Sequence, residues 1–308
     1  MDTIAPNIGA AFKAARLGHF RDAAAFHGYR QVYDRAMADL PAPSATLDVP
    51  TDFGTVRAYR FGPADGVPLL LLPGRTAAAP MWEANLAGLA RSRPVYAIDL
   101  IGEPGLSVQT RPLTSGEDQA AWLASLIDGL PEPELHVLGL SIGGWSAVNL
   151  AVRRPAGVRS LVLLEPAATF GGITWKVVIV SLGSVLPMPR AVRRRLLSWI
   201  SGGADASEDD PVAALIAAGM RDFTASLPRP VYPTDEQLAG IELPTLVIIG
   251  GRSIIHAPAK AAERARRLLR HGTVELWPEA SHAVNGEFPE RVDTTVNAFL
   301  AKAEATPA

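Results

Sequence analysis

The sequence predicts an α/β protein with a mostly parallel central sheet, on two observations. Short, nearly continuous apolar runs recur along the chain, and strands of this kind are buried on both faces, as in parallel sheets. Segments with helical spacing of apolar residues separate the runs, so strands and helices alternate. The apolar runs are 68–73, 94–100, 135–140, 160–165, 244–250 and 273–277, and the helical segments are about 80–91, 116–129, 143–153, 257–269 and 288–302.

Two further kinds of element precede these runs. Residues 1–44 form an expected N-terminal helical extension, because apolar residues recur every three or four positions within 9–40, as an amphipathic helix requires. Pro41 and Pro43 end that helix. Residues 45–61 alternate apolar and polar side chains around Asp52-Phe-Gly54, which predicts two antiparallel strands.

The interval after the sixth expected strand is unusually long. That strand ends at Glu165 and the next begins at Pro244, a far longer separation than a usual crossover, and such an interval is normally an inserted element with its own function. We therefore expect a helical cap (lid) over 168–232, above the carboxyl edge of the sheet. The core then comprises 45–167 and 233–302, and a polar tail, 303–308, is expected to be frayed.

Composition favours a small molecule as the partner. The 308 residues include 29 basic and 31 acidic side chains, a net charge of −2 without a long block of one sign, so no nucleic-acid surface is expected. The chain has no cysteine, which excludes disulfides, thiolate metal sites and cysteine nucleophiles. The histidines are scattered without H-x-H or HExxH spacing, so no metal site is expected. A cofactor is not expected either.

The N-terminus carries Asp2 and no apolar h-region, so it does not resemble a secretory signal and a cytoplasmic location is the default expectation. The most apolar run, 177–187, is shorter than the ~20 residues of a membrane helix and contains serine, glycine and proline. We expect a buried or lid helix there and no membrane span. The sequence does not indicate the oligomeric state.

Residues 135–144 contain the motif G-x-S-x-G with Ser141 at its centre. Gly139 and Gly143 flank the serine because a strand that turns sharply into a helix leaves no room for side chains beside it. The motif alone is weak, since roughly one chain in ten of this length would contain it by chance. Its position between an apolar strand and a helical segment makes Ser141 the candidate nucleophile.

Four landmarks follow one another along the chain. They are Leu72-Pro-Gly74 after the first long parallel strand, the segment from Asp99 to Ser107, the serine motif, and Ala280-Ser-His282 after the last strand. Their residues and their order resemble those of the α/β-hydrolase fold family, and in particular those of a capped serine carboxylesterase-like hydrolase. The resemblance covers about 45–300. Within the family, the N-terminal helix and the pair Met81-Trp82 are similar to bacterial carboxylesterase-like hydrolases.

Acyl transfer needs a base, because a serine hydroxyl is a poor nucleophile at neutral pH. His282 is the expected base, since it follows the last strand and so lies in a loop at the same carboxyl edge as Ser141. His256 is ambiguous. The other histidines fit ordinary structural or surface roles: His19 and His27 in the N-terminal helix, His136 at the start of a strand and His271 before one.

The tetrahedral oxyanion requires two N–H donors, which are backbone groups in this fold. Ile142 supplies one, and the resemblance places the other on Arg75. The Arg75 guanidinium either points into solvent or contacts a carbonyl or carboxylate of the substrate. Pro73 stands where the family commonly has histidine, which should affect loop packing more than the oxyanion hole. Asp99 is expected to hold its own loop through backbone N–H groups.

The third member of the triad departs from the family pattern. In most relatives the acid follows the strand that ends at Gly250, but Ser253 occupies its place here. A serine can orient an imidazole but cannot stabilise the imidazolium by charge. Glu165 is the alternative, because Pro166 keeps it extended at the end of the strand after the serine helix. A helix cap or an arginine partner is the other interpretation of Glu165.

These residues predict a serine hydrolase that cleaves an ester or lactone of a small to medium, largely apolar molecule. The alternatives are carbon–carbon bond hydrolysis, thioesterase or cyclase work on a biosynthetic intermediate, perhydrolysis, and a non-catalytic small-molecule-binding protein. A haloalkane dehalogenase is disfavoured, because it needs a carboxylate where this chain has Ser141. The run Arg193-Arg194-Arg195 either forms a solvent-exposed face or attracts an anionic substrate.

Overall fold

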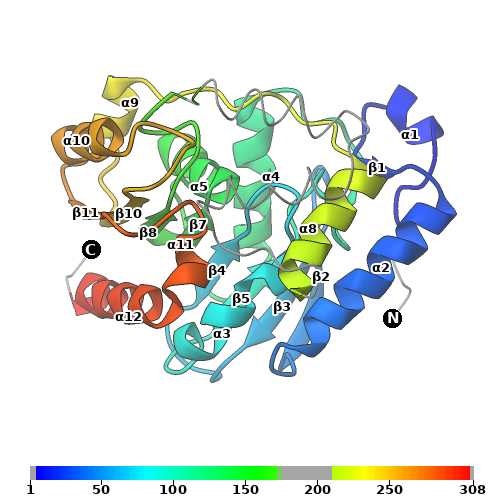
Figure 1. Ribbon diagram of the computed structural model, residues 1–308, viewed down its shortest axis with the longest axis horizontal. Helices are drawn as coiled ribbons and strands as arrows, with labels where there is room; N and C mark the ends of the chain where they lie inside the picture. The colour runs from blue at the N-terminus through cyan, green and yellow to red at the C-terminus, as the bar shows by residue number, and fades with distance from the viewer. Residues whose placement is uncertain (1–4, 173, 175–209, 306–308) are drawn as a thin grey trace.

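The computed structural model describes residues 5–172, 174 and 210–305, and a mostly parallel sheet flanked by helices is its central feature (Figure 1). The strand order is β11-β10-β8-β7-β4-β5-β3-β2, with β6 beside β3. Pairing is parallel from β5 to β11, whereas β3 is antiparallel to β5 and to β2. The strands are β2 Ala45–Thr51, β3 Gly54–Phe61, β4 Leu69–Leu72, β5 Val95–Ile98, β6 Val108–Gln109, β7 Leu135–Leu140, β8 Val158–Leu164, β10 Thr245–Gly250 and β11 Gly272–Trp277. The predicted fold class is confirmed.

The core consists of two apolar layers, one on each face of this sheet. The four leucines of β4 are fully buried and alternate between the layers: Leu70 and Leu72 face one layer, and Leu69 and Leu71 face the other. Such a strand has no polar face because helices cover both sides, and each fully buried leucine contributes roughly 1.5–3 kcal/mol. The nearly continuous apolar runs of the sequence therefore reflect burial on both faces.

The helices divide between the two layers. Buried residues of α4 (Gly116–Asp128), α5 (Ile142–Arg153) and α10 (Pro258–Leu268) join one layer, and those of α3 (Glu83–Leu89) and α12 (Pro289–Ala305) join the other. All five correspond to predicted helical segments. The short elements are the 3-10 helix η1 (Ala79–Trp82), α9 (Asp235–Ala239) and α11 (Val284–Glu287).

The N-terminal extension is less uniform than its periodicity predicts. It comprises α1 (Ala11–Ala14), the short strand β1 (His19–Phe20) and α2 (Ala23–Ala38), so the expectation of one helix over 9–40 that includes His19 is wrong. β1 pairs with β9 (Phe223–Thr224), and a Cβ on Gly18 would lie 2.9 Å from the Phe223 ring. Helical spacing cannot reveal this pairing, because the partner strand lies far along the chain.

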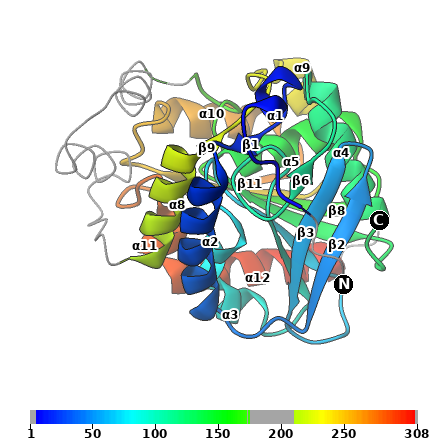
Figure 2. The ribbon, with the colours of Figure 1, turned by 90° about the vertical axis from the view of Figure 1, so that its right-hand side faces the viewer.

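The expected cap, 168–232, lies partly outside the described residues, and the run 177–187 and the three arginines 193–195 lie wholly outside them. Its described part includes α8 (Pro211–Asp222), which lies beside α2 in Figure 2. The segment after α8 contacts the first turn of α5, because the Trp145 indole N–H donates to the Val231 carbonyl at 2.9 Å. It also packs on the loop after β5, because a Cβ on Gly102 would lie 2.5 Å from Leu227 Cδ2. The limits of the cap remain a prediction.

The last helix extends further than expected. α12 continues to Ala305, so residues 303–305 are not frayed. Glu304 pairs with Arg93 and lies 3.1 Å from His136 Nε2, which anchors the last turn to the sheet. Burial lowers the pKa of His136 to about 4. A tertiary ion pair with Arg93 and a hydrogen bond with neutral His136 thus stabilise a helix end that composition alone indicates to be loose.

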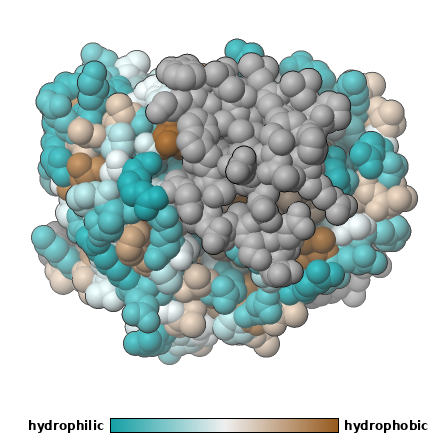
Figure 3. All heavy atoms as spheres, viewed as in Figure 1, coloured by the Kyte–Doolittle hydropathy of each residue, from teal (hydrophilic) through white to brown (hydrophobic). Residues whose placement is uncertain are grey.

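Hydrophilic and hydrophobic residues are interspersed on the described part of the face in Figure 3. The large apolar side chains that are exposed in the described residues are Met220 in α8, and Val231 and Tyr232 in the segment after it. No helix within the described ranges is long and apolar enough to cross a membrane.

Candidate active site

Ser141 lies at the sharp turn between β7 and α5, in a backbone conformation that L-residues rarely adopt. Its φ of 55° and ψ of −115° are strained values for a residue with a side chain. A Cβ on Gly139 would lie 2.3 Å from the Gly143 carbonyl oxygen, and one on Gly143 would lie 2.2 Å from the Leu72 carbonyl oxygen. The expected lack of space beside the serine is confirmed.

Backbone hydrogen bonds tie Ser141 to both sides of Glu165. The Ser141 N–H donates to the Leu164 carbonyl at 3.0 Å, and the Ala167 N–H donates to the Ser141 carbonyl at 3.0 Å. The serine turn and the end of β8 are therefore held together by main-chain contacts, which do not depend on side-chain rotamers.

The structure brings Glu165 and His282 into contact. Glu165 Oε2 lies 3.1 Å from His282 Nδ1, and Glu165 Oε1 accepts a 2.6 Å hydrogen bond from the Gly250 N–H. The Glu165 side chain is fully buried, whereas the His282 side chain is 15% exposed. No hydrogen bond joins Ser141 Oγ to His282 in the described part of the chain, and such contacts often tighten only when substrate binds.

Glu165 is ionised at neutral pH. Burial by itself would raise its pKa, but polar contacts with His256 and His282 outweigh burial and lower the pKa of Glu165 to about 2. A buried carboxylate that stays charged can hold a neighbouring imidazole in one tautomer and stabilise the imidazolium.

His256, which the sequence leaves ambiguous, also faces this acid. Its Nε2 lies 3.5 Å from Glu165 Oε1, and its side chain is 2% exposed. The distance is long for a hydrogen bond, and neither ring nitrogen has a hydrogen-bond partner among the described residues. The only sequence signal for this residue is its position in the loop after β10, at the carboxyl edge of the sheet.

Ser253 does not contact the imidazole of His282 in the described part of the chain. Its side chain is buried, and its Oγ accepts a long, 3.4 Å contact from the Ile255 N–H two residues further on. The residue in the usual place of the acid therefore stabilises its own turn.

The loop after β4 lies beside the serine, because a Cβ on Gly74 would be 3.8 Å from Ser141 Cβ. Two backbone N–H groups of this loop donate to side chains: that of Gly74 to Met81 Sδ at 3.2 Å, and that of Thr76 to Glu103 Oε2 at 3.1 Å. The N–H groups of Arg75 and Ile142 make no hydrogen bond within the described residues. Both proposed oxyanion donors are thus available for a ligand.

Two buried acids from the loop after β5 support this arrangement. Asp99 accepts from the N–H groups of Ala79 at 2.8 Å and Leu106 at 2.7 Å, as expected for a loop-holding residue. Glu103, which the sequence analysis did not identify, pairs with the Arg75 guanidinium at 3.4 Å. The Arg75 side chain, 46% exposed, therefore has an internal partner that neither of its expected interpretations included.

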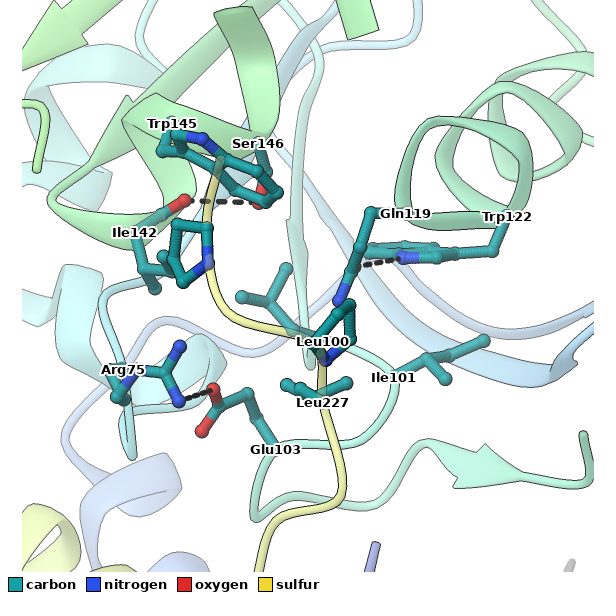
Figure 4. A pocket seen from close by; sticks show the side chains of 12 residues that line it. Arg75, Leu100, Ile101, Glu103, Gln119, Trp122, Ile142, Trp145, Ser146 and Leu227 are labelled. Carbon is teal, nitrogen blue, oxygen red and sulfur yellow. Dashed lines mark hydrogen bonds and ion pairs between the residues drawn. The ribbon is translucent and has the colours of Figure 1, made fainter. Parts of the chain in front are cut away.

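A pocket opens beside the proposed oxyanion donors and is shown in Figure 4. The pair Arg75–Glu103 forms one part of its wall, and the remaining wall is mostly apolar. The other lining residues are Leu100, Ile101, Gln119, Trp122, Ile142, Trp145, Ser146, Leu227, Pro228 and Pro230. Among the described residues, no group of three or more His, Asp or Glu side chains could hold a metal ion.

A parallel α/β sheet with a strained serine at a strand-to-helix turn, and an acid–histidine pair at the same edge, defines a class of hydrolase-like folds. The sequence matches the alpha/beta hydrolase family over residues 69–294, and the chain belongs to this family. The family resemblance seen in the sequence is thereby confirmed.

Three relatives place the chain within the family. Carboxylesterase YbfK of Bacillus subtilis (strain 168) is 30% identical over 280 residues, which cover 88% of this chain and 93% of that protein. The crystal structure of naproxen esterase (carboxylesterase NP) from Bacillus subtilis has a TM-score of 0.82 at 27% identity, covering 88% of this chain and 96% of that chain. A 2-hydroxymuconate semialdehyde hydrolase of Pseudomonas sp. (strain CF600) is 28% identical over 261 residues, 78% of this chain and 89% of that protein.

Proposed function

We propose that this protein is a serine hydrolase that cleaves an ester or lactone of a small to medium, largely apolar molecule. The contact between buried, ionised Glu165 and His282 carries the proposal, together with the backbone hydrogen bonds that tie the strained Ser141 to the residues flanking Glu165. The carboxylesterase relatives support ester hydrolysis.

The proposed acylation uses each of these groups once. Ser141 Oγ attacks the carbonyl carbon while His282 Nε2 accepts the hydroxyl proton, and the N–H groups of Arg75 and Ile142 stabilise the oxyanion. Glu165 holds Nδ1–H and stabilises the imidazolium as it forms. His282 then delivers the proton to the leaving alcohol oxygen, which leaves the acyl group on Ser141.

Deacylation repeats the sequence with water. His282 takes a proton from the water, the resulting hydroxyl oxygen attacks the acyl carbon, and the proton returns to Ser141 Oγ as the acid product leaves. Apolar side chains, among them Leu100, Trp122 and Leu227, line the pocket beside Arg75 and Ile142 and favour a substrate with an apolar group.

Carbon–carbon bond hydrolysis is the second candidate, because a 2-hydroxymuconate semialdehyde hydrolase is among the relatives. The same serine, base and oxyanion donors would serve that reaction. Comparison of p-nitrophenyl esters with a vinylogous diketone distinguishes the two: an ester hydrolase should be much faster on the esters at equal concentration.

Ser141→Ala tests the nucleophile. We expect ester turnover to fall by at least ~10³-fold and fluorophosphonate labelling of the protein to disappear, because the attacking oxygen is lost. Peptide mass spectrometry of the labelled wild type should locate the adduct on Ser141. Ser44→Ala is the control, since Ser44 is exposed and donates only to the Arg60 carbonyl.

The same ester series measures the substrate preference. Medium acyl chains should exceed acetate in kcat/KM by a total of roughly 1–3 kcal/mol, at about 0.8 kcal/mol per buried methylene. Full activity in Ser141→Ala would overturn the proposed mechanism, and a flat chain-length profile would contradict the apolar acyl site.

A further inference from the structure

His256 is a buried histidine that the proposed reaction does not use. Its Nε2 faces Glu165 Oε1 at 3.5 Å, on the oxygen opposite the one that contacts His282. Both nitrogens of its ring are without a hydrogen bond among the described residues. Burying an imidazole without partners costs free energy, so its place beside the acid requires an explanation.

The two oxygens of Glu165 have separate sets of partners. Oε2 contacts His282 Nδ1, while Oε1 accepts from the Gly250 N–H at 2.6 Å and faces His256. Within the described residues, both ion-pair partners of Glu165 are histidines. The Gly250 N–H and the nearby His256 ring on the Oε1 side restrict rotation of the carboxylate, and this restriction directs Oε2 at His282.

The backbone around His256 is fixed by the segment that follows Glu165. The Thr174 N–H donates to the Ile255 carbonyl at 2.8 Å, and Thr174 Oγ1 donates to the Ile254 carbonyl at 2.5 Å. Gly171 leaves room for the ring, because a Cβ there would lie 3.0 Å from His256 Cβ. The acid and the histidine are therefore placed by segments that hydrogen-bond to each other.

We propose that His256 is a positioning residue for Glu165, whose Nε2–H on Oε1 keeps the carboxylate turned toward His282. The inference rests on the proposed function, since it assigns His256 a role through the acid of that same reaction. The proposed acid lies at the end of β8 and not in the loop after β10, where most relatives carry it. In this chain the loop after β10 supplies the His256 imidazole, which supports the acid.

A matched pair of variants tests this role. His256→Gln presents an amide N–H at about the place of Nε2–H, whereas His256→Met has similar length and no donor. We expect His256→Met to lower kcat by about ten- to a hundredfold with KM nearly unchanged, because the polar contact of the imidazole with the buried carboxylate is lost. His256→Gln should stay within about threefold of the wild type by the same reasoning. His271→Met, an exposed histidine that pairs with Glu242, is the control.

A double-mutant cycle separates positioning from a merely structural role. If His256 acts through the carboxylate, His256→Met should have little further effect on kcat in a Glu165→Gln background. An equal loss in both backgrounds would overturn the proposal, as would equal impairment of the Gln and Met variants. If His256→Met does not fold, His256→Asn, whose donor is displaced from the Nε2 position, takes its place with the same expected loss.

Failure of the role proposed for His256 can be distinguished from failure of the proposed serine hydrolase mechanism. An enzyme whose ester turnover depends on Ser141 but is unchanged in His256→Met would overturn this inference alone. Ester turnover that does not depend on Ser141 would overturn the proposed mechanism first, whatever the His256 variants do.

Discussion

Asp99 and Glu165 occupy equivalent positions in the sheet but have opposite electrostatic environments. Each is the residue directly after a parallel strand, β5 or β8, and each is fully buried. Burial raises the pKa of Asp99 above its ordinary value of 3.8, even though backbone N–H groups and the Tyr33 hydroxyl partly oppose it. For Glu165 the opposing contacts prevail, and its pKa is about 2.

The difference lies in the partners and not in the depth of burial. Asp99 binds neutral donors, the N–H groups of Ala79 and Leu106 and the hydroxyl of Tyr33 at 3.0 Å, which tie three segments together. Glu165 faces imidazoles, which can take up a proton during a reaction. An acid at a strand end therefore organises loops or takes part in proton transfer according to what the fold places against it.

The largest expected effect is that of Glu165→Gln. The amide keeps the shape of the side chain but cannot stabilise the His282 imidazolium, so kcat should fall by roughly 10²–10⁴ with little change in KM. Steady-state kinetics on a p-nitrophenyl ester measure both constants. Near-normal turnover in this variant would remove the distinction between the two acids.

Asp99→Asn should affect stability more than chemistry. The N–H groups of Ala79 and Leu106 bind different oxygens of Asp99, and asparagine replaces one of these oxygens with an NH2 group that cannot accept. One N–H group is left without its acceptor, so we expect a loss of about 1–3 kcal/mol in the free energy of unfolding. Urea denaturation measures this loss. Turnover should fall by less than about tenfold, through displacement of the loop that carries Arg75. A kcat loss as large as that of Glu165→Gln would place Asp99 in the proton-transfer machinery instead.

The pH dependence of stability should differ in sign between the two acids. Glu165 has a pKa of about 2 in the folded protein against an ordinary value of 4.5, so its contribution is present above 4.5 and is lost as the pH falls towards 2. The pKa of Asp99 is raised, so its contribution is present below 3.8 and is lost as the pH rises through the folded-state value.

The measurement is the difference in unfolding free energy between wild type and each variant in acid. On lowering the pH, the difference from Glu165→Gln should shrink, whereas the difference from Asp99→Asn should grow in favour of the wild type. Urea denaturation at several pH values between about 3 and 7 gives both slopes. If the two differences in unfolding free energy changed with pH in the same direction, the opposite pKa shifts assigned to Glu165 and Asp99 would be contradicted.

Ser253→Ala should have the smallest effect. Its Oγ makes only the long contact with the Ile255 N–H, so the change should alter stability by less than about 0.5 kcal/mol and kcat by less than about twofold. Ser253→Asp in the Glu165→Gln background should restore part of the activity if a carboxylate there can reach His282. A large loss of kcat in Ser253→Ala would instead indicate that Ser253 is the partner of the His282 imidazole.

The hairpin, the long parallel strands, the main helices and the serine turn could be predicted from the sequence alone, because these features follow from local sterics and periodicity. The leucines of β4 predict a strand buried on both faces, and α4 begins at Gly116 behind a Ser115–Asp118 capping box. Gly139 and Gly143 are required by backbone atoms within the same turn and by the adjacent end of β4. Such features are encoded over a few neighbouring positions.

Contacts between segments that are distant in sequence could not be predicted and are seen only in the folded structure. Glu165 and His282 are 117 residues apart, and their position at one edge was inferred, but the direction of each side chain was not. The ring of His256, the Arg75–Glu103 pair and the β1–β9 strand pair have no periodic signal. Their geometry depends on how whole elements pack, because packing sets the rotamer and the partner of a buried polar group, whereas local pattern sets only the element that carries it.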